Sequence, residues 1–109
     1  MFGSDGNLWP VADMLFGQSG VDAHYEVDTR AGMELRKVRD AFPHLTLFGV
    51  ISSHTLDTGT KEDVEKEVLS CIEAAKEKGS IVVGCSNIIA STTPIENVKA
   101  MVETIRKYR

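Results

Sequence analysis

The stretch GSIVVGCSNIIASTTPIENVKAMVETIRKYR, from Gly79 to Arg109, decides the fold class. It opens with three β-branched residues at 81–83, and their length and composition are typical of a buried strand. A loop of small and polar residues follows, and Pro94 stands where the first turn of a helix begins. Apolar residues then recur at helical spacing: Val98, Met101, Val102 and Ile105. The stretch therefore predicts one βα unit, a strand followed by an amphipathic helix.

The rest of the chain repeats this unit three times. Strands are expected at three further apolar stretches: 1–3, 23–27 and 45–51. Each precedes a helical pattern: 8–16, 33–42 and 60–78. The polar residues 52–59 between the third strand and its helix are expected to form a loop.

Two of the expected helices begin with capping signals. Thr60 is followed three residues later by Asp63, and Thr93 is followed at the same spacing by Glu96. A hydroxyl and a carboxylate at this spacing satisfy each other's backbone amides in a capping box. We therefore expect both threonines to be N-caps.

Strands that alternate with helices predict an α/β fold with a parallel sheet. Four units match either a small open sheet or one half of an eight-stranded (βα)8 barrel, and a whole barrel takes about 250 residues. Residues 1–109 contain no linker and are expected to form a single domain. A half-barrel leaves two sheet edges and one apolar face uncovered, which favours a homodimer or other homo-oligomer.

Composition excludes several classes of partner and location. The net charge of −4 and a pI near 5.3 argue against a nucleic-acid or anionic-membrane surface. No apolar stretch approaches the roughly 20 residues of a transmembrane helix, and the first residues lack the basic region of a signal peptide. Two cysteines without a pattern fit a reducing compartment, so a cytoplasmic protein is expected.

Polar residues follow every expected strand. In a (βα)8 barrel the active site lies on the loops after the strands. That rule places eight residues at the candidate site: Asp5, Asn7, Glu26, Asp28, Ser52, His54, Cys85 and Asn87. A plainer interpretation is that residues 4–7 are only a turn and a helix cap, and that His54 is a solvated loop histidine.

Four motifs, in this order along the chain, resemble those of one family. They are SDGN at 4–7, AGM at 31–33 after Glu26 and Asp28, the segment LFGVI…TL..GT.EDVEKEV at 47–68, and TPIENVKAMV at 93–102. Together they are similar to the uroporphyrinogen decarboxylase superfamily, which includes the corrinoid-dependent and coenzyme M methyltransferases. The resemblance covers essentially the whole chain and implies the last four βα units of a TIM barrel.

The resemblance also implies which residues of this chain occupy the metal and catalytic positions of the family. The methyltransferase branch has a zinc site made of a His-x-Cys pair and a later Cys, which activates a thiol as thiolate. The corresponding positions here are Gly3, Asp5 and Asn87, and Cys85 lies two residues before the last of them. Asp5 and Cys85 are thus candidate metal ligands in an incomplete set. The decarboxylase branch has a histidine at the position of Asn87, and its arginines and catalytic aspartate lie in the first half of the barrel.

Two functions follow as expectations. SDGN, AGM and the pair at 86–87 look closer to the methyltransferase branch, which transfers a methyl group between a corrinoid carrier and a thiol. The resemblance then implies a zinc ion and a corrinoid or tetrapyrrole ligand, or a corrinoid protein as partner. The alternative is a non-catalytic half-barrel that dimerises, because no metal triad or nucleophile–base pair can be assembled from these residues. Weak or absent activity is therefore expected from this chain by itself.

Overall fold

The computed structural model describes residues 1–109 and contains one four-stranded, all-parallel sheet. Its strands are β1 (Phe2–Gly3), β2 (Ala23–Tyr25), β3 (Thr46–Phe48) and β4 (Ile81–Val82). They lie side by side in chain order, and a bridge between Ile51 and Cys85 continues the β3–β4 pairing beyond the strands. The predicted parallel α/β fold is confirmed and is consistent with half of a TIM barrel, although the strands are shorter than predicted.

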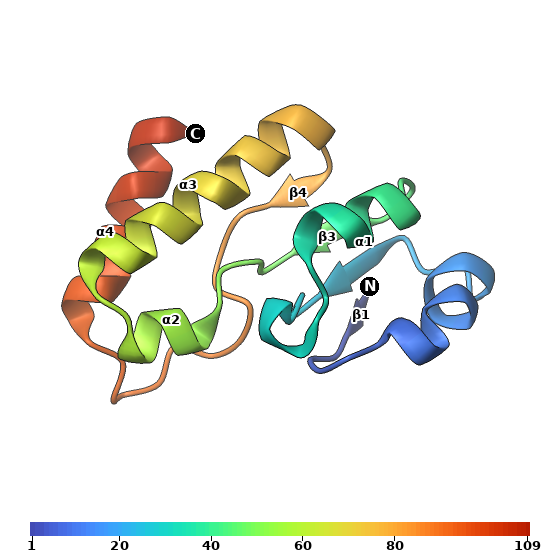
Figure 1. The fold of residues 1–109 in the computed structure, drawn as a ribbon, viewed down its shortest axis with the longest axis horizontal. Coiled ribbons are helices and arrows are strands. Elements are labelled where there is room, and N and C mark those ends of the chain that lie inside the picture. Colours follow the sequence, from blue (N-terminus) through green and yellow to red (C-terminus); the bar gives the residue numbers. More distant parts are fainter.

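Four α-helices and three short helical turns lie between or after the strands. The helices are α1 (Leu35–Ala41), α2 (Ser53–Thr58), α3 (Lys61–Lys78) and α4 (Ile95–Tyr108). The turns are η1 (Trp9–Val11), the π-helical η2 (Asp13–Gln18) and η3 (Thr29–Ala31). Figure 1 shows α4 at one end of the long axis of the molecule and the helical turns that follow β1 at the other end.

Two of the connections differ from their prediction. Residues 52–59, expected as a loop, contain α2, because Leu56 is buried and the Thr58 hydroxyl donates to the His54 carbonyl oxygen at 2.9 Å. The helix expected at 8–16 is divided into η1 and η2 and continues to Gln18. Pro10 lies in the first turn of η1, where its missing N–H costs no helical hydrogen bond.

The capping prediction is correct for α3 and wrong for α4. Thr60 accepts from the Asp63 amide at 3.1 Å, and Asp63 accepts from the Thr60 amide at 2.9 Å, which completes the capping box. These hydrogen bonds lower the pKa of Asp63. In α4 the N-cap is Pro94, which makes no side-chain cap. The Thr93 hydroxyl instead donates to Asp57 at 2.6 Å, because the loop brings it to the end of α2.

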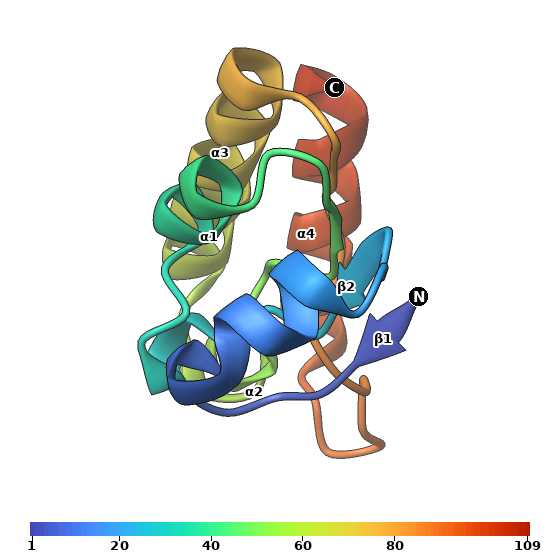
Figure 2. The same cartoon turned by 90° about the vertical axis from the view of Figure 1, so that its right-hand side faces the viewer.

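The two faces of the sheet have different surroundings. In the register of the strands, Phe2, His24, Leu47 and Ile81 form one row. His24 and Leu47 in this row are fully buried, and Figure 2 shows α1 and α3 on one side of the sheet. The adjacent row, on the opposite face, contains Gly3, Tyr25, Phe48 and Val82. Val82 is 48% exposed, so this face is only partly covered.

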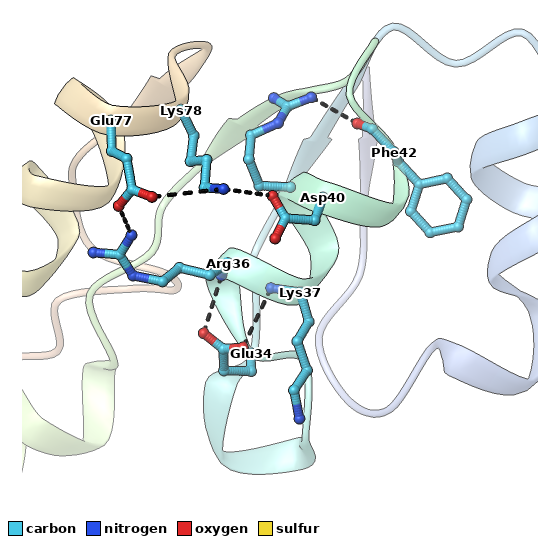
Figure 3. Close-up of polar contacts among 8 residues, drawn as sticks. Glu34, Arg36, Lys37, Asp40, Phe42, Glu77 and Lys78 are labelled. Atoms are coloured by element: carbon cyan, nitrogen blue, oxygen red, sulfur yellow. Dashed lines mark hydrogen bonds and ion pairs between the residues drawn. The ribbon is translucent and has the colours of Figure 1, made fainter.

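Ion pairs connect the outer surface of α1 with the end of α3. Figure 3 shows Arg36 paired with Glu77, and Lys78 between Glu77 and Asp40, with N–O distances of 3.6 and 3.0 Å. The pairing lowers the pKa of Glu77 and raises that of Lys78. All four side chains are partly exposed. Exposed pairs of this kind contribute little to stability, so they orient α1 more than they stabilise it.

His24 introduces a pH dependence into the core. Its Nδ1 lies 3.3 Å from the Phe2 carbonyl oxygen, its Nε2 has no partner, and the ring packs 4.9 Å from that of Phe16. Burial lowers the pKa of His24, so the folded protein keeps the imidazole neutral while the unfolded chain protonates it near pH 6.5. Stability is therefore expected to fall as the pH drops below about 6.5.

This effect is testable by urea denaturation at pH 7.5 and 5.5. The substitution His24→Phe keeps a ring in the same space but cannot be protonated. We expect the variant to lose less stability than the wild type between the two pH values. Equal losses in the two proteins would show that His24 does not cause the acid sensitivity.

None of the helices has both the length and the apolar character needed to cross a membrane.

Candidate functional site

The carboxyl ends of the four strands surround a polar cavity of about 130 Å³. Six of the eight residues predicted for the site line it: Asp5, Glu26, Asp28, Ser52, His54 and Asn87. They come from the segments that follow β1, β2, β3 and β4, including the first turn of α2, and parallel strands place these segments at one edge of the sheet. The structure thus brings together residues that lie as far as 82 positions apart in the sequence.

Hydrogen bonds join the loop after β1 to its neighbours across the cavity. Asn87 donates from Nδ2 to Oδ2 of Asp5 at 3.4 Å. Asp28 accepts from the Gly6 amide at 3.1 Å and, with its other oxygen, from the Ala31 amide at 3.2 Å. Asp28 therefore caps η3 and holds the first loop at the same time.

Glu26 has an unusual backbone conformation, with φ = 73°. A residue with a side chain rarely adopts a positive φ, and the conformation costs about 1 kcal/mol or more. The turn at Glu26 separates β2 from Val27, which is buried, and from Asp28, which caps η3. The strained position lies at the rim of the cavity, where backbone strain often accompanies function.

Serines form much of the remaining wall. The Ser53 amide donates to Oγ of Ser86 at 3.3 Å, and the Ser52 amide donates to Glu67 on α3 at 2.7 Å. Ser86 is buried, and its own amide donates to the Ile51 carbonyl oxygen at 2.7 Å. These contacts fix the loops after β3 and β4 to each other and to α3.

Two of the predicted residues do not line the cavity. Asn7 accepts from the Trp9 amide at 3.1 Å, as expected of the plainer interpretation in which residues 4–7 make a turn. Cys85 is half-buried and is not part of the cavity wall. His54 does line it, but the residue is exposed, and its Nε2 lies 3.2 Å from the hydroxyl of Thr58.

Three residues of the wall were not predicted: Arg30, Ser53 and Ser86. Ser53 and Ser86 are direct neighbours of Ser52 and Asn87, so a wider window after each strand would have included them. Arg30 comes shortly after Glu26 and Asp28 in the chain. Its position in the sequence does not indicate that its side chain lines the cavity.

The cavity is acidic. Asp5, Glu26 and Asp28 contribute three carboxylates, and Arg30 is the only Lys or Arg residue in its wall. Counting the aspartates, the glutamate and the arginine, the wall has two excess negative charges. A wall of this charge favours a neutral or positively charged group of a ligand and repels an anionic one.

Larger hollows lie along the helices. One of about 290 Å³ is lined by residues of α1 and α3, among them Glu34, Arg36 and Glu67. Glu34 caps α1, Arg36 pairs with Glu77, and Glu67 accepts from Ser52. The strand-end cavity is the better candidate, because residues that follow all four parallel strands line it.

The residues present do not fit a zinc ion. No group of three or more His, Cys, Asp or Glu side chains in the structure is arranged to hold a metal. Cys85 does not line the cavity that contains Asp5. The two candidate ligands suggested by resemblance do not form a metal site here.

The two cysteines are expected to differ in reactivity. Cys71 is buried on α3, its thiol lies 3.7 Å from the Val50 carbonyl oxygen, and burial raises its pKa to about 12. Cys85 is less buried. In the folded protein at pH 8, we expect Ellman's reagent to modify Cys85 first and Cys71 only after unfolding. Fast native-state modification of a Cys85→Ala variant would contradict this assignment.

The uroporphyrinogen decarboxylase (URO-D) family model matches residues 5–108. Comparisons with curated proteins and with solved structures found no match. The family match spans nearly the whole chain and includes all four loops that line the cavity. Together with the parallel sheet and the polar strand ends, it shows that the chain belongs to the uroporphyrinogen decarboxylase family.

Proposed function

We propose that the chain is a member of the methyltransferase-like branch of this family, and that its strand-end cavity binds the polar end of a small neutral or cationic substrate. The observation that carries the proposal is the charge of the cavity, with three carboxylates and one arginine. A methyl group is commonly carried on a neutral or positively charged nitrogen, oxygen or sulfur, and such groups are attracted to this wall or are indifferent to it.

The same charge disfavours the decarboxylase branch. Uroporphyrinogen carries many carboxylates, and each of them would meet a wall of like charge. Size points the same way, since small-molecule sites typically enclose about 300–1,000 Å³ and this cavity has about 130 Å³. A tetrapyrrole or corrinoid does not fit inside it. In the proposed function a corrinoid approaches from outside, carried by a partner protein, while the cavity holds the smaller molecule.

Binding of a small cation tests this proposal. Tetramethylammonium is a suitable probe because it has a full positive charge and no hydrogen-bond donor, and uroporphyrin is the anionic counterpart. We expect calorimetry at low salt to detect tetramethylammonium and not uroporphyrin, with the affinity falling as salt is added. Binding of uroporphyrin in preference to the cation would overturn the proposal.

Charge-neutralising variants locate the binding. Asp5→Asn and Glu26→Gln each remove one carboxylate and keep the shape of the side chain, and each is expected to raise the dissociation constant about two- to fivefold. Asp22→Asn is the matched control, because Asp22 is exposed and precedes β2 at the opposite end of that strand. An equal effect of the control would mean that the cation responds only to net charge.

A second candidate is a non-catalytic half-barrel. The observation that favours it is the lack of any three side chains arranged to hold a metal. The direct test is transfer of a methyl group from methylcobalamin to a thiol by the purified chain. We expect a rate no higher than that of buffer. A rate well above it would eliminate the non-catalytic alternative and support the methyltransferase assignment.

A further inference from the structure

The exposed hydrophobic side chains of this protein are confined to its two terminal βα units. Nine large apolar side chains are exposed: Met1, Val11, Met14, Val82, Ile88, Ile89, Ile95, Val102 and Tyr108. None of them lies between residues 15 and 81. Met14 is 60% and Ile95 is 62% exposed. Scattered surface hydrophobics need no explanation, but a concentration at two separate borders indicates surfaces that another molecule covers.

The same two borders have opposite charge. Residues 1–20, which include β1, η1 and η2, contain two carboxylates, Asp5 and Asp13, and no lysine or arginine. In residues 95–109, which form α4 and its end, Lys99, Arg106, Lys107 and Arg109 outnumber two glutamates. Figure 1 places α4 and the segment after β1 at opposite ends of the molecule. One end is thus complementary in charge to the other, and both are partly apolar.

The outer edges of the sheet at these two borders are also unpaired. β1 and β4 each have a strand neighbour on one side only. A two-fold axis parallel to the strands leaves the direction of every strand unchanged. Two copies related by such an axis therefore pair β4 of each copy with β1 of the other, in parallel both times, which gives eight parallel strands and no free edge.

From these observations we propose that two copies of this chain close an eight-stranded parallel barrel, with the β4–α4 border of each copy docked on the β1–η2 border of the other. The interface is made twice, so the assembly stops at two copies. It brings the apolar residues of α4, such as Ile95 and Val102, towards Val11 and Met14 of the second copy. It also encloses the partly covered face of the sheet, which carries Val82.

The dimer would also determine where the two strand-end cavities lie, whichever ligand they bind. Because the axis is parallel to the strands, the strand-end cavities of both copies open at the same end of the barrel. A dimer would hold two equivalent acidic cavities around one axis. Loss of the dimer and loss of cation binding are measured separately, so failure of one proposal is distinguishable from failure of the other.

Light scattering on a sizing column, over a range of protein concentrations, is the first test. The expected mass is twice 11.9 kDa. A monomer at every concentration would overturn the proposal, and so would oligomers that continue to grow with concentration, because a closed barrel cannot exceed two copies. Added salt is expected to raise the dissociation constant, since the two borders attract each other electrostatically.

Two edge variants identify the surfaces. Met14→Glu and Val102→Lys each change one border and are each expected to raise the dissociation constant at least tenfold. Ala41→Lys is the matched control, because Ala41 is exposed at the end of α1 in the middle of the chain, and it should leave the dimer unchanged. Circular dichroism confirms that each variant is folded before its mass is measured.

Mixing the two edge variants is the decisive experiment. A mixed dimer has one interface that carries both changes and a second interface that is entirely native. We therefore expect an equimolar mixture to dimerise more tightly than either variant alone. A Val102→Lys protein that dimerises like the wild type, or a mixture no tighter than its components, would overturn the proposed pairing of opposite borders.

Discussion

Replacing Gly49 by alanine is expected to lower the free energy of unfolding by about 3 kcal/mol. Gly49 is buried, has φ = 62° and lies where β3 leads into the site. A methyl group there would be 2.6 Å from the Cys85 carbonyl oxygen and 2.9 Å from a ring carbon of Tyr25. The first contact is with the backbone of the loop after β4, so relief requires that β3 and this loop move apart.

Gly20→Ala separates the two contributions to this loss. Gly20 also has a positive φ, of 77°, but no atom lies within 4 Å of the added carbon. This control therefore measures the backbone conformation alone, which costs about 1 kcal/mol. Urea denaturation of both variants gives the comparison. If the two substitutions cost the same, the close approach of β3 to the β4 loop is not as described.

Replacing Arg39 by methionine is expected to cost about 3 kcal/mol. Arg39 is only 3% exposed and donates to three carbonyl oxygens, those of Leu45, of Phe42 at 2.6 Å and of Ser80 at 3.4 Å. It thereby joins the end of α1 to the residues that precede β3 and β4. Methionine fills similar space but leaves the Leu45 carbonyl oxygen without a donor, whereas those of Phe42 and Ser80 still accept from the Leu45 and Leu47 amides. A buried acceptor without a partner costs about 1–3 kcal/mol, and the two charge-assisted bonds are lost as well.

Arg39→Lys is the informative companion to this substitution. Lysine keeps the charge but has one nitrogen in place of the planar guanidinium, so it cannot reach all three carbonyl oxygens. We expect its stability, measured by thermal or urea denaturation, to lie between those of the wild type and the methionine variant. A methionine variant as stable as the wild type would show that water satisfies the Leu45 carbonyl group.

The sequence pattern predicts the parallel α/β fold because each βα unit has separate local signals for its strand and for its helix. The β-branched residues at 81–83 indicated β4, and the capping box at Thr60 marked the start of α3. Helix α2 was missed because its sequence, SHTLDT, has a single apolar residue and strong turn formers. What makes it a helix is burial of Leu56, which depends on the rest of the fold.

The start of α4 is a second place where a tertiary contact replaces the hydrogen bond that the local sequence predicts. Thr93 and Glu96 have the right spacing for a capping box. The Thr93 hydroxyl is instead bonded to Asp57, a residue 36 positions earlier, and no local rule anticipates that contact. Asn97 is a related case, since its amide donates to the Leu56 and Gly59 carbonyl oxygens at 2.9 and 2.8 Å and fixes α4 to the end of α2.

The position of the candidate site followed from topology more than from any single motif. Parallel strands place every loop after a strand at one edge, so Asp5, Glu26, Asp28 and Asn87 converge although no spacing connects them. What sequence reasoning did not provide is the detail within each loop. Asn7 is used in its own turn, and Arg30 enters the wall because the chain turns at Glu26.

The most direct test of the account is a nuclear magnetic resonance titration of ¹⁵N-labelled protein with tetramethylammonium. If the acidic strand-end cavity is the ligand site, the shifts will be largest for the Gly6 amide, which donates to Asp28, and for the side-chain amide of Asn87, which donates to Asp5. Residues along the hollow between α1 and α3, such as Ser70 and Ala74, will be unaffected. Shifts centred on that hollow, or none at all, would contradict the assignment of the site.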